Sequence, residues 1–310
     1  MTFKGGMSTR PQQENIYFQR INAVLDHARR NLDKDLSLET LAAVAGFSPF
    51  HFHRVFKALT GETVSDMAIR LRLERAVALL RSAPELSITA AAYECGFRSA
   101  SVFSRAFKKQ FGITARGWDR QSPLKNSKNG QVLDGFPRYT AESLKTFEGH
   151  NLFNVQVRSL PAQRLAYIRV FDSYADFNRV KSAFHRLCDW YSRHVGDLSE
   201  TTLFGMSQDD PEITPLNLCR FDWCLKVPVE VEPEGEVDIL DFPACEAASL
   251  HCLGGIEQED KALQYLFRHW LPNSRYQPAN LPAMEIYRRL PSELGWDFYD
   301  MDCAIPIVAL

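Results

Sequence analysis

The chain has 310 residues, of which 45% are hydrophobic and 24% are charged, with a formal net charge of −2 and seven scattered cysteines. This composition is typical of a globular protein, and the length is enough for two domains or slightly more. No run of about 18 apolar residues is present, and the first residues lack the charged-then-apolar pattern of a secretory signal, which argues against a membrane or secreted protein. We therefore expect a cytoplasmic protein with reduced thiols, no metal site, no cofactor and no membrane partner.

The charge is distributed unevenly along the chain. Residues 1–125 contain 19 Lys and Arg against 11 Asp and Glu, whereas residues 126–310 contain 17 against 27. A basic third followed by an acidic remainder predicts that only the first part meets a polyanion. Between the two parts, residues 121–150 are rich in polar residues, Gly and Pro and show no sustained apolar period, so we expect a linker there.

The basic part contains an internal repeat. After a segment at residues 1–15 that we expect to be flexible, an apolar stripe starting at Ile16 predicts a first helix. Residues 37–47 and 87–97 then align at a constant offset of 50, and each copy contains a serine N-cap, a short Ala-rich helix and a terminal glycine. Each copy is followed, across a turn, by a second helix that begins behind a serine.

The second helix of each unit has two distinct faces. Phenylalanine and aliphatic residues recur at helical spacing on one face, which predicts packing inside the unit. The other face is polar or basic, and we expect it to point outward. It carries Phe50, His53, Arg54 and Lys57 in the first unit and Ser101, Ser104, Arg105 and Lys108 in the second.

Between the units, residues 65–83 contain no Gly or Pro and have a broad apolar face, which predicts one continuous helix. Nineteen residues at 1.5 Å each span roughly 28 Å, comparable with the ~34 Å between successive major-groove faces of a DNA duplex. A short helix, a glycine turn and a basic amphipathic helix form the helix-turn-helix arrangement that places a helix in the major groove. The outward arginines are suited to guanine, and Lys57 and Lys108 to phosphates. The alternative is a plain helical bundle with solvated basic faces.

Residues 16–120 resemble the DNA-binding domain of the AraC/XylS family of bacterial transcription regulators. The stretches that carry the resemblance are LSLETLAAVAGFSPFHFHRVFKALTG, RLRLERAVALL and SITAAAYECGFRSASVFSRAFKKQFGI. The resemblance implies a seven-helix domain of two units that binds promoter double-stranded DNA, with RNA polymerase as a further partner. Two departures predict looser packing of the second unit: Ala91 replaces a larger aliphatic residue, and ITARGW at 113–118 lacks the family's usual Ser-Pro.

The acidic part contains a second repeat. Residues 155–170 align with residues 237–252 at an offset of 82, and both copies read as a strand, a Pro-Ala turn and a second strand. Each copy is followed by an aromatic helix and then by a short apolar closing strand. After the all-α double helix-turn-helix domain, we therefore expect an α+β domain over residues 151–310, built from two pseudo-symmetric strand-helix-strand halves.

This order of elements, the segment PAMEIYRRLP at 282–291 and the fusion to an AraC-type domain resemble the GyrI-like family of small-molecule-binding domains. The arrangement is similar to that of Rob-type regulators, in which the DNA-binding part comes first. The resemblance implies an aromatic cleft between the two halves that binds hydrophobic and often cationic compounds. It also implies that Glu285 is the acidic residue of that cleft.

The residues themselves place Glu285 between two apolar neighbours in an expected central strand, with Tyr287 facing the same way two positions later. A carboxylate in an apolar strand is costly unless it is paired. An edge strand, or a salt bridge to Arg288 or Arg289, is the structural alternative. Trp223, on a closing strand, offers a ring for cation–π contact, so it joins Glu285 and Tyr287 as a candidate ligand-binding residue.

Two classes of function fit these patterns. The preferred one is a sequence-specific DNA-binding transcription regulator, not an enzyme, whose C-terminal domain binds a small hydrophobic or cationic effector. The alternative keeps DNA binding but makes the GyrI-like domain a hydrolytic enzyme acting on a small reactive compound. No Ser-His-Asp or Cys-His set with recognisable local spacing is present, and the pair His251-Cys252 is weak evidence for catalysis, so no catalytic residue is assigned.

Overall fold

The computed structural model describes residues 10–120, 124 and 153–310, with side chains from residue 15 onward. The first helix, α1 (Arg10–Arg30), begins inside the segment that was expected to be flexible. Pro11 suits the first turn of a helix, and neither Gly nor Pro interrupts the chain between there and the end of α1. The rest of that segment, and all of the expected linker at 121–150 except Leu124, lie outside the described residues.

The two repeated units fold in the same way. Ser37 and Ser87 each accept a hydrogen bond from the backbone N–H three residues later, which starts the first helix of each unit. The second helices both end at a glycine with a positive φ, at 77° for Gly61 and for Gly112. The helices that follow α1 are α2 (Leu38–Ala45), α3 (Pro49–Thr60), α4 (Val64–Ser82), α5 (Ile88–Glu94) and α6 (Ala100–Phe111).

Helix α4 is shared between the two units. Its first half contributes Met67 to the core formed with α1, α2 and α3, and its second half contributes Val77 to the core formed with α5 and α6. The seventh helix that the resemblance implied is absent from residues 10–120. Residues 114–117 form a single turn instead, in which Thr114 Oγ1 accepts a hydrogen bond of 3.1 Å from the Gly117 N–H. We refer to residues 10–120 as the helical domain.

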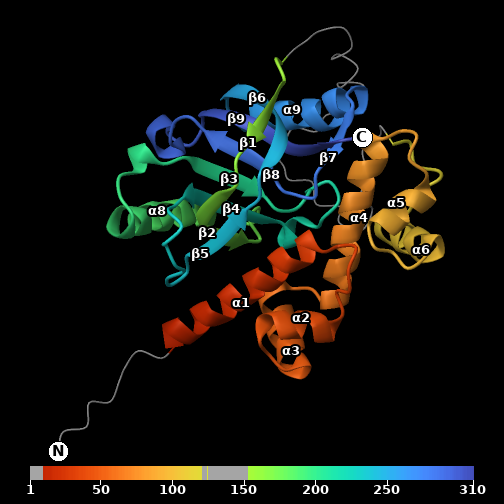
Figure 1. Ribbon diagram of the computed structural model, residues 1–310, viewed down its shortest axis with the longest axis horizontal. Coiled ribbons are helices and arrows are strands. Elements are labelled where there is room, and N and C mark those ends of the chain that lie inside the picture. The colour runs from red at the N-terminus through yellow and green to blue at the C-terminus, as the bar shows by residue number, and fades with distance from the viewer. Residues whose placement is uncertain (1–9, 121–123, 125–152) are drawn as a thin grey trace, which may run out of the picture.

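The second domain, residues 153–310, is built on one antiparallel sheet with the strand order β1-β6-β9-β8-β3-β4-β2-β5, and β7 pairs with β9 (Figure 1). The strands are β1 (Gln156–Leu160), β2 (Gln163–Phe171), β3 (Leu203–Ser207), β4 (Arg220–Lys226), β5 (Asp238–Phe242), β6 (Cys245–Gly254), β7 (Tyr276–Pro278), β8 (Ala283–Tyr287) and β9 (Tyr299–Ala309). The helices are α8 (Phe177–His194) and α9 (Ile256–Tyr265), with short helical turns at η1 (Leu198–Glu200), η2 (Leu216–Leu218), η3 (Leu266–Trp270), η4 (Leu271–Asn273) and η5 (Pro291–Leu294). We refer to it as the sheet domain.

The sheet domain has the expected pseudo-symmetry. The strands of the two halves correspond as β1 to β5, β2 to β6, β3 to β8 and β4 to β9. When each strand is replaced by its counterpart, the strand order is the same read from the opposite end. Two strands were not expected, β3 in the first half and the short β7 in the second. Strand β3 pairs at the centre of the sheet with β8, the strand expected around Glu285. The first strand of each half pairs with the other half, β1 with β6 and β5 with β2. Two-residue hairpins require residues that adopt positive φ. The Pro-Ala connections at 161–162 and 243–244 cannot supply them, because proline fixes φ near −65°.

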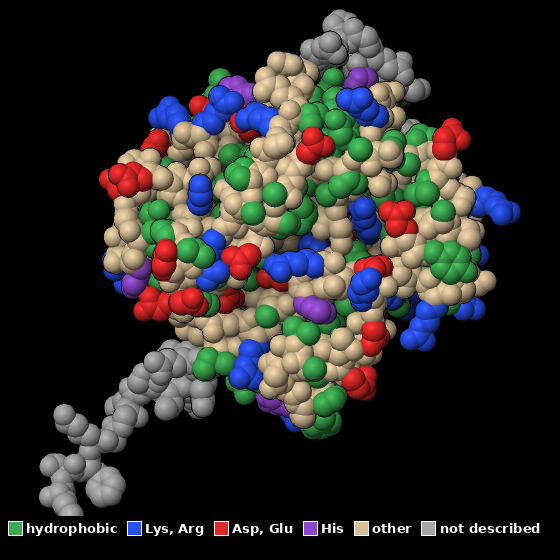
Figure 2. Space-filling view, viewed as in Figure 1, with side chains coloured by type: hydrophobic (Ala, Val, Ile, Leu, Met, Phe, Trp, Pro, Cys, Tyr) green, Lys and Arg blue, Asp and Glu red, His purple; other side chains and the backbone are tan. Residues whose placement is uncertain are grey.

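Helices α8 and α9 cover one face of the sheet, each over its own half (Figure 1). The helical domain lies along another side, where α1 contacts β2 and β5, and α4 packs on β7. In Figure 2, Asp and Glu side chains gather at the left edge over the sheet domain, and Lys and Arg side chains project from the helical domain at the lower right. The predicted organisation, an all-α domain followed by an α+β domain, is confirmed.

Candidate functional site

A cavity of about 390 Å³ lies between the sheet and the two helices of the sheet domain. It sits where the two halves meet, because β3 and β8 at the centre of the sheet both contribute to its wall. This volume is within the range of small-molecule sites. Its aromatic lining comes from several separate elements and includes Phe177, Phe221, Trp223, Tyr287, Trp296 and Tyr299.

Glu285 points into this cavity from the centre of the sheet. Its strand pairs with β3 on one side and with β9 on the other, so the edge-strand alternative is excluded. The salt-bridge alternative is excluded as well, since Arg288 donates to Asp302 and Arg289 pairs with Glu293. Glu285 is 6% exposed, and within the described part of the chain it has no Lys or Arg partner.

Two neighbours fix the position of the Glu285 carboxylate. The Tyr287 hydroxyl donates a hydrogen bond of 2.5 Å to Glu285 Oε2, which confirms that the two side chains face the same way. Gly205 is the partner of Glu285 on β3, and a Cβ atom at that glycine would lie 2.5 Å from Glu285 Oε2. The absence of a side chain at Gly205 therefore leaves the space that the carboxylate occupies.

A second carboxyl group, Glu259 of α9, lines the same cavity, close enough to Glu285 for the two groups to interact electrostatically. Burial, and then the neighbouring Glu285 charge, raise the pKa of Glu259 well above its usual value. Burial also raises the pKa of Glu285, although hydrogen bonds from Tyr287 and Glu259 partly oppose that shift. Burial thus raises the pKa of both carboxyl groups of this pair.

Sequence reasoning missed Glu259, although a signal for it was available. Residues three and seven positions later, Ala262 and Leu266, are fully buried on the same face of the helical segment. An acidic residue on an apolar helix face is as unusual as one in an apolar strand.

The aromatic residues form a connected wall around the acid pair. Trp223 is 2% exposed, its Nε1 donates a hydrogen bond of 2.9 Å to the Val180 carbonyl oxygen, and its ring centroid lies 5.4 Å from that of Tyr287. Lys181 Nζ lies 4.8 Å from the centroid of Phe177 and 5.6 Å from that of Trp296. These two cavity rings already accept a cation from the protein itself.

The three predicted ligand residues Glu285, Tyr287 and Trp223 thus lie around one cavity, and their role in binding stays a prediction.

The side chains of His251 and Cys252, the weak candidates for catalysis, do not lie together. His251 is exposed and its Nε2 lies 2.8 Å from Asp300, whereas Cys252 is buried on the other face of β6. Within residues 10–120, 124 and 153–310, no group of three His, Cys, Asp or Glu side chains is arranged to hold a metal ion. None of the described helices is long and apolar enough to cross a membrane.

The structure also divides the second helix of each unit into the two expected faces. In α3, Phe52 and Phe56 are fully buried, while Phe50 is 75% exposed and the basic residues beside it face solvent. In α6, Phe103 and Phe107 are fully buried. All eight predicted DNA-contacting residues are exposed, namely Phe50, His53, Arg54, Lys57, Ser101, Ser104, Arg105 and Lys108. Their contacts with DNA remain a prediction.

Comparison with known proteins identifies both domains. The family model of the GyrI-like small molecule binding domain matches residues 153–307, and that of a helix-turn-helix domain matches residues 41–121. The transcriptional regulator Rob of Salmonella typhimurium is 39% identical over 94 residues, which are 30% of this chain and 32% of that protein. The HTH-type transcriptional regulator GlxA of Rhizobium meliloti is 37% identical over 100 residues, 32% of this chain and 31% of that protein. The chain thus spans about a third of the length of these curated relatives.

Among solved structures, the C-terminal domain of EcmrR is 16% identical with a TM-score of 0.41, covering 51% of this chain and 99% of that one. The DNA-binding domain of AdpA, solved in complex with a target DNA, is 32% identical with a TM-score of 0.30, covering 31% of this chain and 86% of that one. Because the matched sheet domain makes up half of the sequence, the chain belongs to the family of proteins with a GyrI-like small molecule binding domain, here preceded by an AraC-type helix-turn-helix region.

Proposed function

We propose that the protein is a sequence-specific transcription regulator that binds promoter DNA through α3 and α6 and binds a small hydrophobic cation in the cavity of the sheet domain. It acts in the cytoplasm, with RNA polymerase as a further partner. The observation that carries the effector assignment is Glu285, a buried carboxylate in an aromatic cavity with no Lys or Arg partner among the described residues.

The cavity contains a carboxylate, Glu285, that has no Lys or Arg partner among the described residues, and a hydrophobic cation can pair with it. A buried carboxylate is costly without a counter-charge, and a lipophilic cation supplies that charge. The rings around it, Trp223 and Tyr287 among them, contact the apolar groups of such a ligand and attract its charge through their π faces. A neutral ligand of the same shape gains the ring contacts but not the charge pairing.

The DNA assignment is supported by the two exposed faces at the ends of one continuous helix. Helix α4 separates the two units. Its 19 residues, at roughly 1.5 Å each, give it a length of roughly 28 Å. Arg54 of α3 and Arg105 of α6 are exposed in separate units packed on the two halves of α4, an arrangement suited to reading two successive major-groove segments. The curated relatives of this region are themselves named as transcription regulators.

Calorimetric titration of the full-length chain tests the effector class. Tetraphenylphosphonium should bind saturably, and the neutral compound triphenylphosphine oxide should bind much more weakly. Selection from a random duplex pool tests the DNA function and should return one enriched sequence motif. Failure of the cation to bind contradicts the effector assignment, and failure of any motif to enrich contradicts sequence-specific DNA binding.

The alternative, a hydrolytic sheet domain, has one supporting observation. Glu259 and Glu285 line the same cavity and burial raises the pKa of both, and such a pair of carboxyl groups is suited to general acid–base chemistry. A panel of labile esters tests it. Turnover that disappears in Glu259→Gln would favour the enzyme, whereas saturable binding without turnover favours the regulator.

A further inference from the structure

The connection between β3 and β4, residues 208–219, joins the cavity to the helical domain. We call it the β3–β4 loop. Its flanking residues Ser207 and Arg220 line the cavity, as does Asp209 near its start. Its middle part leaves the sheet and is buried against helices of the other domain, where Ile213 and Thr214 are each 1% exposed. One loop therefore touches the cavity at both ends and the helical domain at its tip.

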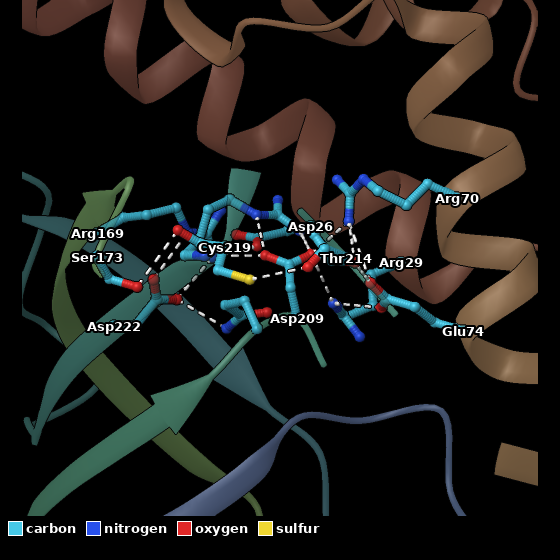
Figure 3. A network of polar contacts seen from close by, with 12 residues as sticks. Asp26, Arg29, Arg70, Glu74, Arg169, Ser173, Asp209, Thr214, Cys219 and Asp222 are labelled. Carbon is cyan, nitrogen blue, oxygen red and sulfur yellow. Dashed lines mark hydrogen bonds and ion pairs between the residues drawn. The ribbon is translucent and has the colours of Figure 1, made fainter. Parts of the chain in front are cut away.

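Asp209 is the first point of contact (Figure 3). Its carboxylate accepts two hydrogen bonds of 2.7 Å from Arg220, one of 2.7 Å from Arg70 Nη1 of α4, and lies 3.7 Å from Arg29 of α1. Burial alone would raise the pKa of Asp209, but Arg220 and Arg70 outweigh it and hold the pKa well below the usual value. Asp209 is therefore an anion that pairs with the cavity wall through Arg220, with α4 through Arg70 and with α1 through Arg29.

The contacts continue from Arg70 to the end of α3. Arg70 Nη2 donates a hydrogen bond of 2.5 Å to Glu62, which follows the glycine that ends α3. Thr214 of the loop accepts a hydrogen bond of 3.2 Å from Arg70. Leu218 lies close to the same helix end, since a Cβ atom at Gly61 would be 3.5 Å from its Cδ2 atom. The loop thus holds the end of the first DNA-reading helix.

The tip of the loop holds the second unit. Glu212 accepts a hydrogen bond of 2.8 Å from Arg81, in the last turn of α4, and is also paired with Arg268 of the sheet domain. Ile213 packs into the core of the second unit, and its carbonyl oxygen accepts a hydrogen bond of 3.3 Å from Gln110 near the end of α6. The same twelve-residue segment therefore contacts the C-terminal ends of both DNA-reading helices.

We propose that the β3–β4 loop couples the cavity to DNA binding by setting the orientation of α3 relative to α6. This rests on the proposed function, namely that the cavity takes a cationic effector. A cation paired with Glu285 lies in the cavity that Asp209 and Arg220 also line, so it adds a positive charge near an anion that also pairs with Arg70 and Arg29. Binding of the cation changes the strength of the ion pairs that Asp209 makes with the arginines. The β3–β4 loop transmits this change to the C-terminal ends of α3 and α6. Because coupling is reciprocal, DNA must change effector affinity by the same factor as effector changes DNA affinity.

The test uses two matched variants of the full-length protein. Glu212→Gln removes the charge at the loop tip, and Asp26→Asn removes the charge of another carboxylate that bridges the domains, between α1 and Arg169 of β2. The two carboxylates are similarly buried, at 20% and 17% exposure of the side chain, and neither lines the cavity. For each protein, the Kd for a selected duplex is measured with and without saturating tetraphenylphosphonium, and the Kd for the cation with and without DNA.

In the wild type we expect both Kd values to change by the same factor, about 5- to 150-fold. Glu212→Gln should reduce that factor to less than twofold while the cation still binds with wild-type affinity, and Asp26→Asn should keep the wild-type factor. Equal loss of coupling in both variants, retained coupling in Glu212→Gln, or no coupling in a wild type that binds the cation would overturn the role of the loop.

A second measurement needs no effector and separates this inference from the proposed function. The selected duplex is altered by one inserted base pair between its two half-sites. The wild type, whose helices are held at a set orientation, should lose at least tenfold in affinity, and Glu212→Gln should lose less than threefold. If the cation fails to bind, the effector assignment fails, and this spacing measurement alone decides the role of the loop: equal losses in the two proteins would overturn it.

Discussion

Replacing Glu285 by Gln tests the charge that we expect to select the ligand. The substitution keeps the size of the side chain and its ability to accept a hydrogen bond from the Tyr287 hydroxyl, which lies 2.5 Å from Oε2 in the wild type. It removes only the negative charge. Any difference in ligand affinity between a cation and a neutral compound of similar shape can then be assigned to that charge.

The size of the effect follows from the burial of the carboxylate. Glu285 is 6% exposed, so a bound cation would pair with it away from solvent. Loss of one partner from such a desolvated pair costs about 2–4 kcal/mol, which corresponds to a weakening of roughly 30- to 700-fold in Kd. The affinity for triphenylphosphine oxide should change by less than about twofold. Glu246→Gln, an exposed position on β6 outside the cavity, is the control and should affect neither ligand.

The same variant should be at least as stable as the wild type, and the sign depends on pH. Burial raises the folded-state pKa of Glu285 above its unfolded value, so protonation stabilises the fold. That contribution is complete below the unfolded pKa of about 4.3 and is lost as pH rises through the folded pKa. The stability gained by Glu285→Gln should therefore be small at pH 4 and larger at pH 8.

Calorimetry with the two ligands and urea unfolding at the two pH values provide the measurements. Equal loss of affinity for the cation and the neutral compound would refute the assignment of Glu285 as the selecting charge. Unchanged cation affinity with a destabilised fold would show that the carboxylate is structural.

Three further outcomes are expected. Cation affinity should rise with pH by up to about tenfold per unit as Glu259 and Glu285, whose pKa values burial raises, lose their protons, and a calorimetric profile that stays flat above the ordinary glutamate pKa of about 4.3 would contradict it. Phe52→Ala, which empties a fully buried position of α3, should lower the free energy of unfolding by about 3–5 kcal/mol, whereas Phe50→Ala, at a 75% exposed position, should change it by less than about 0.5 kcal/mol in the same urea titration. Arg54→Ala should reduce the binding free energy by which the protein discriminates one or two base pairs of the selected duplex by about 1–3 kcal/mol. Equal weakening of the Kd for all duplex sequences would instead make Arg54 a phosphate contact.

Much of the helical domain could be predicted because its determinants are local. The serine caps at Ser37 and Ser87, the glycines that end the helices and the spacing of the phenylalanines all act within a single helix or turn. Repetition at an offset of 50 residues made each pattern visible twice. The inward and outward faces of α3 and α6 followed from helical periodicity, except that Val102, expected on the inward face of α6, is 36% exposed. The turn at residues 114–117, in the part of the chain that the structure describes, lies in a segment, ITARGW, that already departed from the family pattern.

The two pseudo-symmetric halves of the sheet domain were predicted, but the pairing of strands between the halves differs from the prediction. Alternation in the strand placed Glu285 and Tyr287 on one face, and the structure agrees. The exchange of β1 and β5 between the halves was not predicted, although the Pro-Ala connections that prevent a hairpin are visible in the sequence. The apolar helix face that carries Glu259 was visible in the sequence, but its proximity to Glu285 depends on the packing of α9 over the centre of the sheet.

The two units, the two halves and the residues on their faces are encoded locally, because caps, periodicity and strand alternation act over at most about twenty neighbouring residues. How the parts meet depends on contacts between residues that lie far apart in the chain. Arg70 and Asp209 are 139 positions apart and join across the domain interface at 2.7 Å. Neither residue lies in a pattern that points to the other, since a buried ion pair between domains depends on the shape of both surfaces and on how closely they pack.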